Sequence, residues 1–339
     1  ERPGAADAAW MFRLTTQAGI KGAYVTRRAN DRGALRAGVH PSLLPGGRTM
    51  DEAGEVEPSW GPIMNREPGR DAHAILQACA DHEVDVLFCI GVDPLRDLPD
   101  AALARRALAN VDHVVVQSLE LGSLESYASA FLPAAPFIEK EGHVTTWEGR
   151  GQRLKPIRGA QGISLPDWEI FASMALACGG DLGFESLEEL HEEMGALLAP
   201  REVATSLTTS GSNPSPAPDH LQLFTYPLLV DEGRLSERAD ELKAALEPEA
   251  FVEIHPDDAS AAGIADGALA VITTDAGSAT LPARVTEHVA EGAIFVPFNQ
   301  PGFAANTLLS GEMIARASIA PAGGSADATA EAEPVGSEA

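Results

Sequence analysis

Residues whose types and spacing could serve a ligand site stand in three short segments. In the first, IGVDP, Gly91 and Asp93 follow an apolar run directly. A glycine there lets the backbone turn sharply, and open α/β sheets bind their ligands at the carboxyl ends of their strands. The same pattern is also an ordinary way for a chain to leave a strand, so alone it leaves both interpretations open.

The second segment, WEGRGQ, places Glu148, Gly149 and Arg150 side by side. Gly149 marks a point where the backbone comes close to another group, and the two charges are costly to bury unless they are paired. These residues either line a ligand cleft or form a Glu–Arg network that holds two loops together. The third segment, VPFNQPGFAAN, contributes the side-chain amides of Asn299 and Asn306.

Catalytic and metal-ligating residues are not indicated by the sequence. The cysteines, Cys79, Cys89 and Cys178, each lie in an apolar pattern, whereas an iron–sulfur cluster takes four thiolates at short spacings. We expect all three to be buried core residues. No histidines have the H-x-x-x-H spacing, and His113 is interpreted as a residue of a sheet and not as a ligand. The motifs of serine hydrolases and phosphate-binding loops do not occur either.

The charge balance excludes one class of partner. Acidic side chains number 50 against 24 basic ones, which gives a net charge of −26 over 339 residues. Such a chain repels phosphate backbones, so we expect no binding to nucleic acid. A generally acidic proteome explains the charge as simply as a function does. No run reaches the roughly 18–20 apolar residues that cross a bilayer, so we expect no direct membrane insertion, and the start without Met or signal-peptide features is interpreted as a fragment.

Helical and buried-strand patterns alternate in the first half. A helix over residues 8–18 and a short strand at 23–25 come first, and Arg27–Pro68, rich in Gly, Pro, Asn and Asp, is predicted to be a long irregular connection. Together the patterns that follow predict a doubly wound, mostly parallel α/β sheet, with strands buried on both faces. These patterns are the helices Asp71–His82 and Pro99–Ala109 and the strands Val84–Gly91 and Val111–Gln117.

Two further helices are predicted from capping patterns. One is capped by Ser164 with Asp167, and the other begins at Ser186 with Glu189 three residues on. The glutamates of the second helix most simply form a solvated face, with an acidic docking surface as the alternative. The apolar face of the first helix is expected to contain Trp168, Phe171, Ala172, Ala175 and Leu176, and that of the second Leu187, Leu190, Met194, Leu197 and Leu198.

Composition divides the chain into parts. Residues 199–219 are rich in Pro, Ser and Thr and predict a linker after an α/β domain over 1–198. Short strands separated by Gly and Asp turns predict a small β-barrel over 220–320, and residues 321–339 are predicted to be disordered. The strand patterns are Phe251–Ile254, Ala268–Thr274, Ala279–Thr286 and Ala293–Pro297.

The order of the motifs resembles the molybdopterin oxidoreductase family over residues 10–318. One family segment carries LP, E..G and EGR.Q, and it is similar to LPAAPFIEKEGHVTTWEGRGQ in this chain. The family has a Gly-x-Asn-Pro turn where this chain has IGVDP. The family's N..G segment resembles ANDRGA. HPDDASAAGIADG with the following strands resembles its dinucleotide-binding domain, a double-psi β-barrel. The resemblance makes these residues the candidate lining of a cofactor cleft: Gly91, Asp93, Glu148, Gly149, Arg150, Asn299 and Asn306.

Departures from the family pattern predict that this cleft is vestigial. Members that bind the pterin usually carry a Thr-Gly-His or Arg-rich stretch where the barrel begins, but this chain has Asp231 and Glu232 there. An anionic diphosphate favours cationic or N–H donors. Asp31 and Asp93 add further negative charge, so we expect no molybdopterin and no other cofactor in this part of the protein.

Within the family, the chain looks most like the large iron–sulfur subunit of the NADH-quinone oxidoreductases, also called respiratory complex I. The segments that carry this resemblance are EKEGH, LPDWEI and VPFNQPGFAANTLL. This resemblance implies a scaffold without catalytic residues, with the iron–sulfur clusters of the full-length subunit located upstream. It also implies partners in the peripheral arm, including the NADH-binding flavoprotein, on the cytoplasmic side of the plasma membrane. The alternatives are an active molybdenum enzyme, such as a formate dehydrogenase or nitrate reductase, and a small-ligand sensor.

Overall fold

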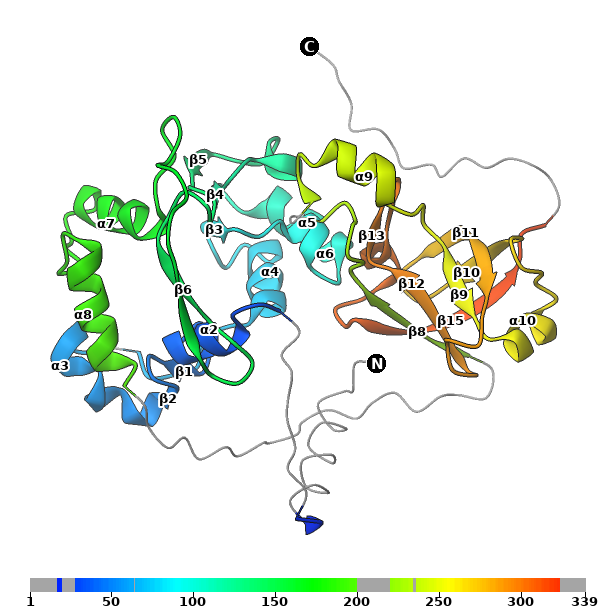
Figure 1. Ribbon diagram of the computed structural model, residues 1–339, viewed down its shortest axis with the longest axis horizontal. Helices are drawn as coiled ribbons and strands as arrows, with labels where there is room; N and C mark the ends of the chain where they lie inside the picture. The colour runs from blue at the N-terminus through cyan, green and yellow to red at the C-terminus, as the bar shows by residue number, and fades with distance from the viewer. Residues whose placement is uncertain (1–16, 20–27, 64, 200–219, 234–235, 324–339) are drawn as a thin grey trace. The chain divides into compact units, whose positions relative to one another are not determined.

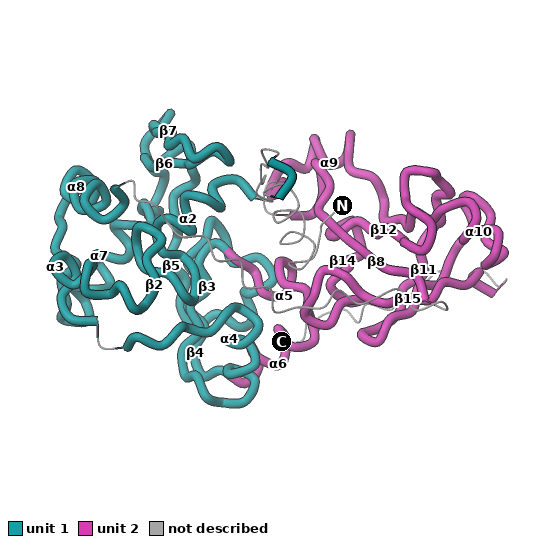
Figure 2. The backbone as a smooth tube through the Cα atoms, turned by 90° about the horizontal axis from the view of Figure 1, so that it is seen from below, with its two compact units in different colours: residues 1–91, 111–213 teal, residues 92–110, 214–339 magenta. Residues whose placement is uncertain are grey.

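The computed structural model describes residues 17–19, 28–63, 65–199, 220–233 and 236–323 (Figure 1). The predicted strand at 23–25, nearly all of the linker and most of the tail lie outside these residues, as does most of the first helix. The chain forms two compact units (Figure 2). The first unit takes residues 1–91 and 111–213, and the second takes 92–110 and 214–339.

A parallel sheet is the centre of the first unit. Its strands β3 (Val86–Ile90), β4 (His113–Ser118) and β5 (Ala130–Pro133) lie in the order β3-β4-β5, and both neighbouring pairs are parallel. The predicted α/β class is therefore confirmed. In the central strand β4, Val114 and Val116 are buried, as expected. The expectation of burial on both faces is wrong for the edge strand β3, whose first and last residues are exposed.

The helices of the first unit differ in how well their sequences predict them. Helix α4 (Ala72–Ala80) is confirmed and is capped by Asp71, and α8 (Leu187–Leu197) begins with the predicted capping box of Ser186 and Glu189. For α7 (Asp167–Ala177) the predicted cap is wrong, because Pro166 occupies the cap position and the Ser164 hydroxyl donates to the Gln161 carbonyl instead.

Burial on the two long helices of this unit is smaller than their patterns predict. Ile170 is the buried residue of α7, whereas Phe171 and Leu176, expected on the inner face, are exposed. On α8 only Leu197 is buried. An apolar face is therefore present on both helices, but the described residues cover little of it.

The expectation of an irregular connection over Arg27–Pro68 is wrong for about half of that segment. It contains several short elements, each closed by local hydrogen bonds: Gly38 ends the first helix in the left-handed conformation, and Glu52 completes a capping box with Thr49. Local capping can hold short turns that have no apolar periodicity to reveal them. The elements are α2 (Asp31–Ala37), β1 (Leu43–Leu44), β2 (Arg48–Thr49), η1 (Met50–Glu55) and α3 (Glu57–Trp60).

The second unit contains a closed barrel, which confirms the predicted β-barrel. Its strand order is β10-β11-β9-β12-β8-β15. Four of these strands match the predicted ones, but β8 and β15 are additional and close the barrel by pairing with each other, with β8 also parallel to β12. The strands are β8 (Leu221–Tyr226), β9 (Val252–Ile254), β10 (Leu269–Thr273), β11 (Ser278–Val285), β12 (Ala293–Pro297) and β15 (Ile314–Pro321).

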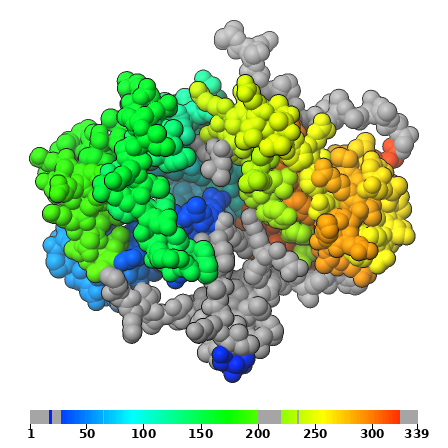
Figure 3. Space-filling model, in the orientation of Figure 1, coloured from blue at the N-terminus to red at the C-terminus, as the bar shows by residue number. Residues whose placement is uncertain are grey.

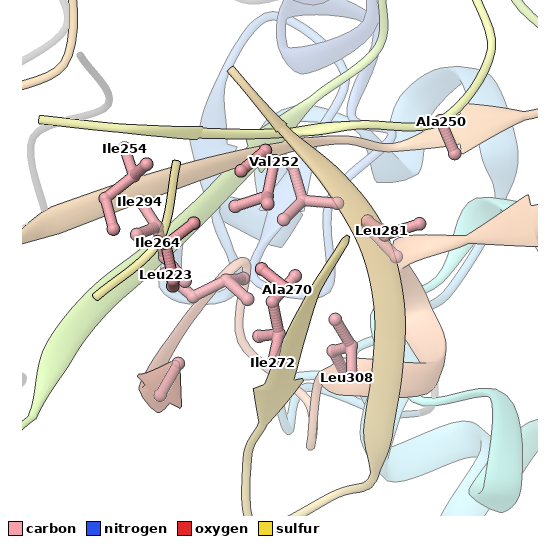
Figure 4. Packing of buried hydrophobic residues seen from close by; sticks show 14 of the residues in the cluster. Leu223, Ala250, Val252, Ile254, Ile264, Ala270, Ile272, Leu281, Ile294 and Leu308 are labelled. Carbon is pink, nitrogen blue, oxygen red and sulfur yellow. The ribbon is translucent and has the colours of Figure 1, made fainter. Parts of the chain in front are cut away.

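The inward side chains of these strands form one apolar core. Leu223, Ile254, Ile272 and Ile294 are each fully buried and point toward one another (Figure 4). Alternation along a strand sends every second residue to the same side. A closed sheet therefore gathers these residues from separate strands into one cluster.

Shorter elements complete both units. Among the described residues, the cysteines Cys79 and Cys89 are buried as expected, but the expectation is wrong for Cys178, which is exposed just beyond the end of α7. None of the described helices combines the length and apolarity that crossing a bilayer requires. The remaining elements are η2 (Gly122–Leu124), β6 (Gly142–Thr145) and β7 (Gly151–Leu154) in the first unit, and α5 (Pro94–Asp97), α6 (Ala101–Asn110), α9 (Asp240–Leu246), α10 (Pro256–Ala262), β13 (Asn299–Gln300), β14 (Phe303–Ala304) and η4 (Ala305–Leu308) in the second.

Candidate functional site

The strand exit at Gly91 and Asp93 is built by local hydrogen bonds. Gly91 has φ of +59°, a conformation that favours glycine, and its N–H donates to the Gln117 carbonyl at 2.8 Å. Asp93 is buried and caps α5: its Oδ1 accepts from the Leu95 N–H at 3.0 Å, while its own N–H donates to Asp97. The Asp93 carboxylate is thus engaged in holding the turn.

Asn306 fixes the same turn from within the second unit. Its Nδ2 donates to the carbonyl of Leu95 at 2.7 Å and to that of Leu98 at 3.2 Å. Nearby, the Gly311 N–H donates to the Pro99 carbonyl at 2.9 Å. These bonds explain why residues 92–110 pack with the barrel, and they bring two of the predicted site residues, Asp93 and Asn306, to one turn.

Asn299, another predicted site residue, lies beside an acidic segment. Asn299 is buried, and its carbonyl accepts from the Glu232 N–H at 3.3 Å. The next residue, Gln300, donates from Nε2 to the Pro248 carbonyl at 2.6 Å. Strand β13 therefore connects the segments around residues 232 and 248.

Three carboxyl groups, the amine of Lys243 and the nearby guanidinium of Arg96 set the electrostatics of this place. The Lys243 amine lies 2.9 Å from Oε2 of Glu232, and this hydrogen bond raises the pKa of Lys243 above its ordinary value. Burial raises the pKa of Asp231, although the Gly233 N–H opposes the shift. Burial also raises the pKa of Glu247, and the negative charge of Glu232 raises it further. Sequence reasoning missed Lys243, Glu247 and Gln300, because no local pattern signals residues that meet only in the folded chain.

The carboxyl groups of this arrangement disfavour the diphosphate of a pterin dinucleotide, although the guanidinium of Arg96 also acts on Asp231. Such a group needs cationic or N–H donors. Within the described part of the second unit, the buried side-chain atoms that lack a hydrogen-bond partner are all oxygens, and the amine of Lys243 is held by Glu232. These unpartnered oxygens are Thr225 Oγ1, Asp231 Oδ2, Glu247 Oε1, Gln300 Oε1 and Asn306 Oδ1.

The remaining predicted site residues lie on the hairpin of β6 and β7 in the first unit. Gly149 has φ of +92° at the turn, and Arg150 forms an ion pair with Glu148. Both charged side chains are largely exposed. Further pairs join the Arg153 Nε to Glu141 at 2.6 Å and the Arg158 Nε to Glu139 at 2.7 Å. The ion-pair network that was one interpretation of this segment is thus present.

The N..G segment packs on this hairpin (Figures 1 and 3). The Oδ1 of Asn30 accepts from the Thr145 N–H at 2.8 Å. A Cβ on Gly33 would clash with that Oδ1, so a larger residue there would displace the Asn30 side chain from its bond to Thr145. Asn30 and Gly33 therefore position the hairpin, and no group of three or more His, Cys, Asp or Glu side chains in the described chain is arranged to bind a metal ion.

Comparison with known proteins agrees with this architecture. The model of the molybdopterin oxidoreductase family matches residues 7–176, and that of the molydopterin dinucleotide binding domain matches residues 230–325. Acetylene hydratase from Pelobacter acetylenicus superposes with a TM-score of 0.56 at 18% identity, covering 79% of this chain and 49% of that one. This likeness supports the fold.

Curated relatives extend well beyond this chain. The G subunit of the NADH-quinone oxidoreductase of Streptomyces coelicolor is 33% identical over 86% of this chain and 35% of its own length, and that of Mycobacterium tuberculosis is 34% identical over 88% and 38%. A putative formate dehydrogenase of Staphylococcus haemolyticus is 30% identical over 82% of this chain and 33% of its own length. The chain spans about a third of the length of these relatives. It belongs to the molybdopterin oxidoreductase family.

Proposed function

We propose that this chain is a scaffold region of the large iron–sulfur subunit of complex I, the NADH-quinone oxidoreductase. That subunit supports the transfer of electrons from NADH through iron–sulfur clusters, which lie elsewhere in it, toward quinone. The observation that carries the proposal is the pair of buried, unpartnered carboxyl oxygens of Asp231 and Glu247, which disfavours the anionic cofactor of the family. The relatives named as subunits of NADH-quinone oxidoreductase support the same assignment.

The surface of the first unit supports a packing role. Most of the large apolar side chains that are exposed in the described chain belong to this unit, among them Phe137, Ile157, Ile163 and Leu176. Exposed apolar side chains that gather on one part of a protein mark surfaces for other chains or segments. In this proposal they contact other subunits of the peripheral arm, the NADH-binding flavoprotein belonging to the same assembly, and the chain is held at the cytoplasmic side of the plasma membrane through that assembly.

Co-purification tests the proposal directly. A tagged full-length protein is recovered from membranes in its native host, and the associated subunits are identified by mass spectrometry. Recovery with the NADH-binding flavoprotein in near-equal amounts is the expected result. Recovery of the tagged protein alone from the soluble fraction would contradict the proposal.

A molybdenum-dependent oxidoreductase is the second candidate function, favoured by the relatives that are named as formate dehydrogenases. The two candidates differ in cofactor content. Metal analysis of the full-length protein should give essentially no molybdenum if this region is a scaffold, and close to one molybdenum per chain if it belongs to an active molybdenum enzyme. Iron in cluster amounts is expected in both cases.

A further inference from the structure

A cavity in the first unit has no part in the proposal above. It lies between helix α2, the hairpin of β6 and β7, and helix α8, and its volume is about 750 Å³. Ligand pockets of proteins usually have volumes of about 300–1,000 Å³. The cavity is lined by Asn30, Gly33, Ala34, Arg36, Ala37, Val39, His143, Thr145, Gly151, Arg153, His191, Met194, Gly195, Leu198 and Ala199.

The charge of this lining is opposite to that of the whole chain. The lining contains two arginines and two histidines and no carboxylate, although the chain has 50 acidic and 24 basic residues. A concave site with one sign of charge concentrates ions of the other sign. The cavity therefore favours an anion.

The two histidines of the lining are in contact with each other at one side of this space. The rings of His143, on β6, and His191, on α8, have centroids 5.0 Å apart and meet edge to face at 80°. Neither ring has a hydrogen bond or an ion pair to another residue of the described chain. Each imidazole has at least one N–H to donate. Two donors from separate elements thus remain for a ligand beside the ring pair.

The arginines add donors on either side. Arg153 uses its Nε and Nη2 for Glu141, and Arg36 uses its Nη2 for the carbonyl of Leu198 at the end of α8. A guanidinium has five N–H donors in a planar fork, so each arginine keeps further donors for an oxyanion. The paired groups also fix both side chains in place.

The other lining residues set the shape. Small side chains, such as those of Gly33 and Ala37, leave the space open, while Met194 supplies an apolar wall and the largely exposed Val39 lies at the rim. Inorganic phosphate alone would fill only a small part of such a volume. A phosphate that carries an organic group would fill more of it and would also contact the apolar wall.

We propose that this cavity binds a phosphomonoester, with the phosphate beside the contacting rings of His143 and His191 and next to Arg153, and the organic group against Met194. The proposal does not depend on the function proposed above, since the cavity lies wholly within the first unit.

Calorimetric titration of the 339-residue chain with phenyl phosphate, inorganic phosphate and phenol separates the contributions. Phenyl phosphate should bind with a single saturable site, inorganic phosphate more weakly at the same site, and phenol not at all. Titration of ¹³C-labelled histidine should shift the signals of His143 and His191 and leave those of the other histidines unchanged.

Two conservative variants test the residues. Arg153→Gln and His191→Asn should each weaken the binding of phenyl phosphate by about tenfold or more, the loss expected for a hydrogen bond to a charged group. Arg70→Gln and His113→Asn are the matched controls, since neither residue lines the cavity. Arg70 is also a half-exposed arginine paired with a glutamate. His113 is an exposed histidine of the same unit. The controls should bind as the parent does.

Three results would overturn the proposal. The first is the absence of saturable binding to the correctly folded parent, verified by circular dichroism. The second is equal affinity of the parent and both cavity variants. The third is binding of Zn²⁺ at the histidine pair without any binding of phenyl phosphate, which would make the site a metal site.

Discussion

The barrel and the parallel sheet differ in how the backbone hydrogen-bonding groups at their strand edges are paired. In the barrel, each of the six strands has a neighbour on both sides, and the inward side chains share one core. The described sheet of the first unit has three strands, with β3 and β5 as the outer two, and a short bridge from Ala134 to Leu165 extends the pairing beyond β5. Unpaired strand edges and exposed apolar side chains usually need to be covered. The barrel therefore closes on itself within the described residues, whereas the described part of the first unit leaves a strand edge and many apolar side chains exposed.

Tryptophan offers a way to follow the two units separately. All four tryptophans, Trp10, Trp60, Trp147 and Trp168, belong to the first unit. Tryptophan fluorescence therefore follows the unfolding of that unit, while hydrogen exchange of peptides from β8 to β15 follows the barrel.

The largest effect is expected in the barrel core. Ile272→Ala removes a fully buried side chain and should lower the free energy of unfolding by about 2–5 kcal/mol. Leu176→Ala, at a residue of α7 that is 66% exposed, should change it by less than about 0.5 kcal/mol. Urea unfolding followed by both probes measures this contrast. If Ile272→Ala shifts the tryptophan transition as far as the barrel exchange, the two units unfold together and the comparison fails.

The next effect concerns the contact of α2 with the hairpin. Gly33→Ala places a Cβ against Oδ1 of Asn30, closer than real contacts allow, and should cost about 1–3 kcal/mol by overpacking. Gly54→Ala is the control, since its Cβ would meet nothing within 4 Å. The tryptophan transition in urea should move for Gly33→Ala alone, with the barrel unchanged. A shift of similar size for both variants would show that general backbone effects dominate.

A third prediction tests whether residues 92–110 depend on the barrel. Asn306→Ala removes the donor to the carbonyls of Leu95 and Leu98 and should destabilise α5 and α6 locally by about 1–3 kcal/mol. Hydrogen exchange of peptides from 92–110 should accelerate. The neighbouring Thr307→Ala, which loses only an exposed hydroxyl bond to Ala304, should leave this exchange unchanged. If Asn306→Ala leaves the hydrogen exchange of residues 92–110 unchanged, these residues belong with the first unit and not with the barrel.

The smallest effect depends on pH. Burial raises the pKa of Asp231, so between the unfolded value of about 3.9 and the raised folded value the native state binds a proton that the unfolded chain has released. The free energy of unfolding therefore falls as pH rises through this window. Asp231→Asn keeps the acceptor for the Gly233 N–H but does not ionise. The free energy of unfolding of the variant minus that of the parent should therefore be larger at pH 7 than at pH 3.

Urea unfolding at both pH values, followed by hydrogen exchange of the barrel, measures this gain. Glu241→Gln, at an exposed position of α9, is the control and should show no such difference. An Asp231→Asn variant that loses stability on going from pH 3 to pH 7 as the parent does would show that the carboxyl is not a source of the pH dependence.

The sequence by itself determined the fold class and the elements with a clear apolar pattern, such as α4, α8, β4 and β12. Apolar runs such as those around Val114 and Ile294 predict buried strands because burial depends on side-chain type along a short stretch. The capping box of Ser186 and Glu189 is equally local and was predicted correctly. The order of the motifs pointed to the family because it reflects the whole chain and not one segment.

Only the tertiary structure decided which residues meet. Strands β8 and β15 close the barrel through pairing across nearly one hundred residues, as Leu223 with Ala315 shows. Likewise, the oxygens around Asp231 and the histidines around the cavity come together from distant segments. Sequence patterns report each side chain's local preference, whereas these contacts depend on long-range packing, which brings together residues that no local pattern relates.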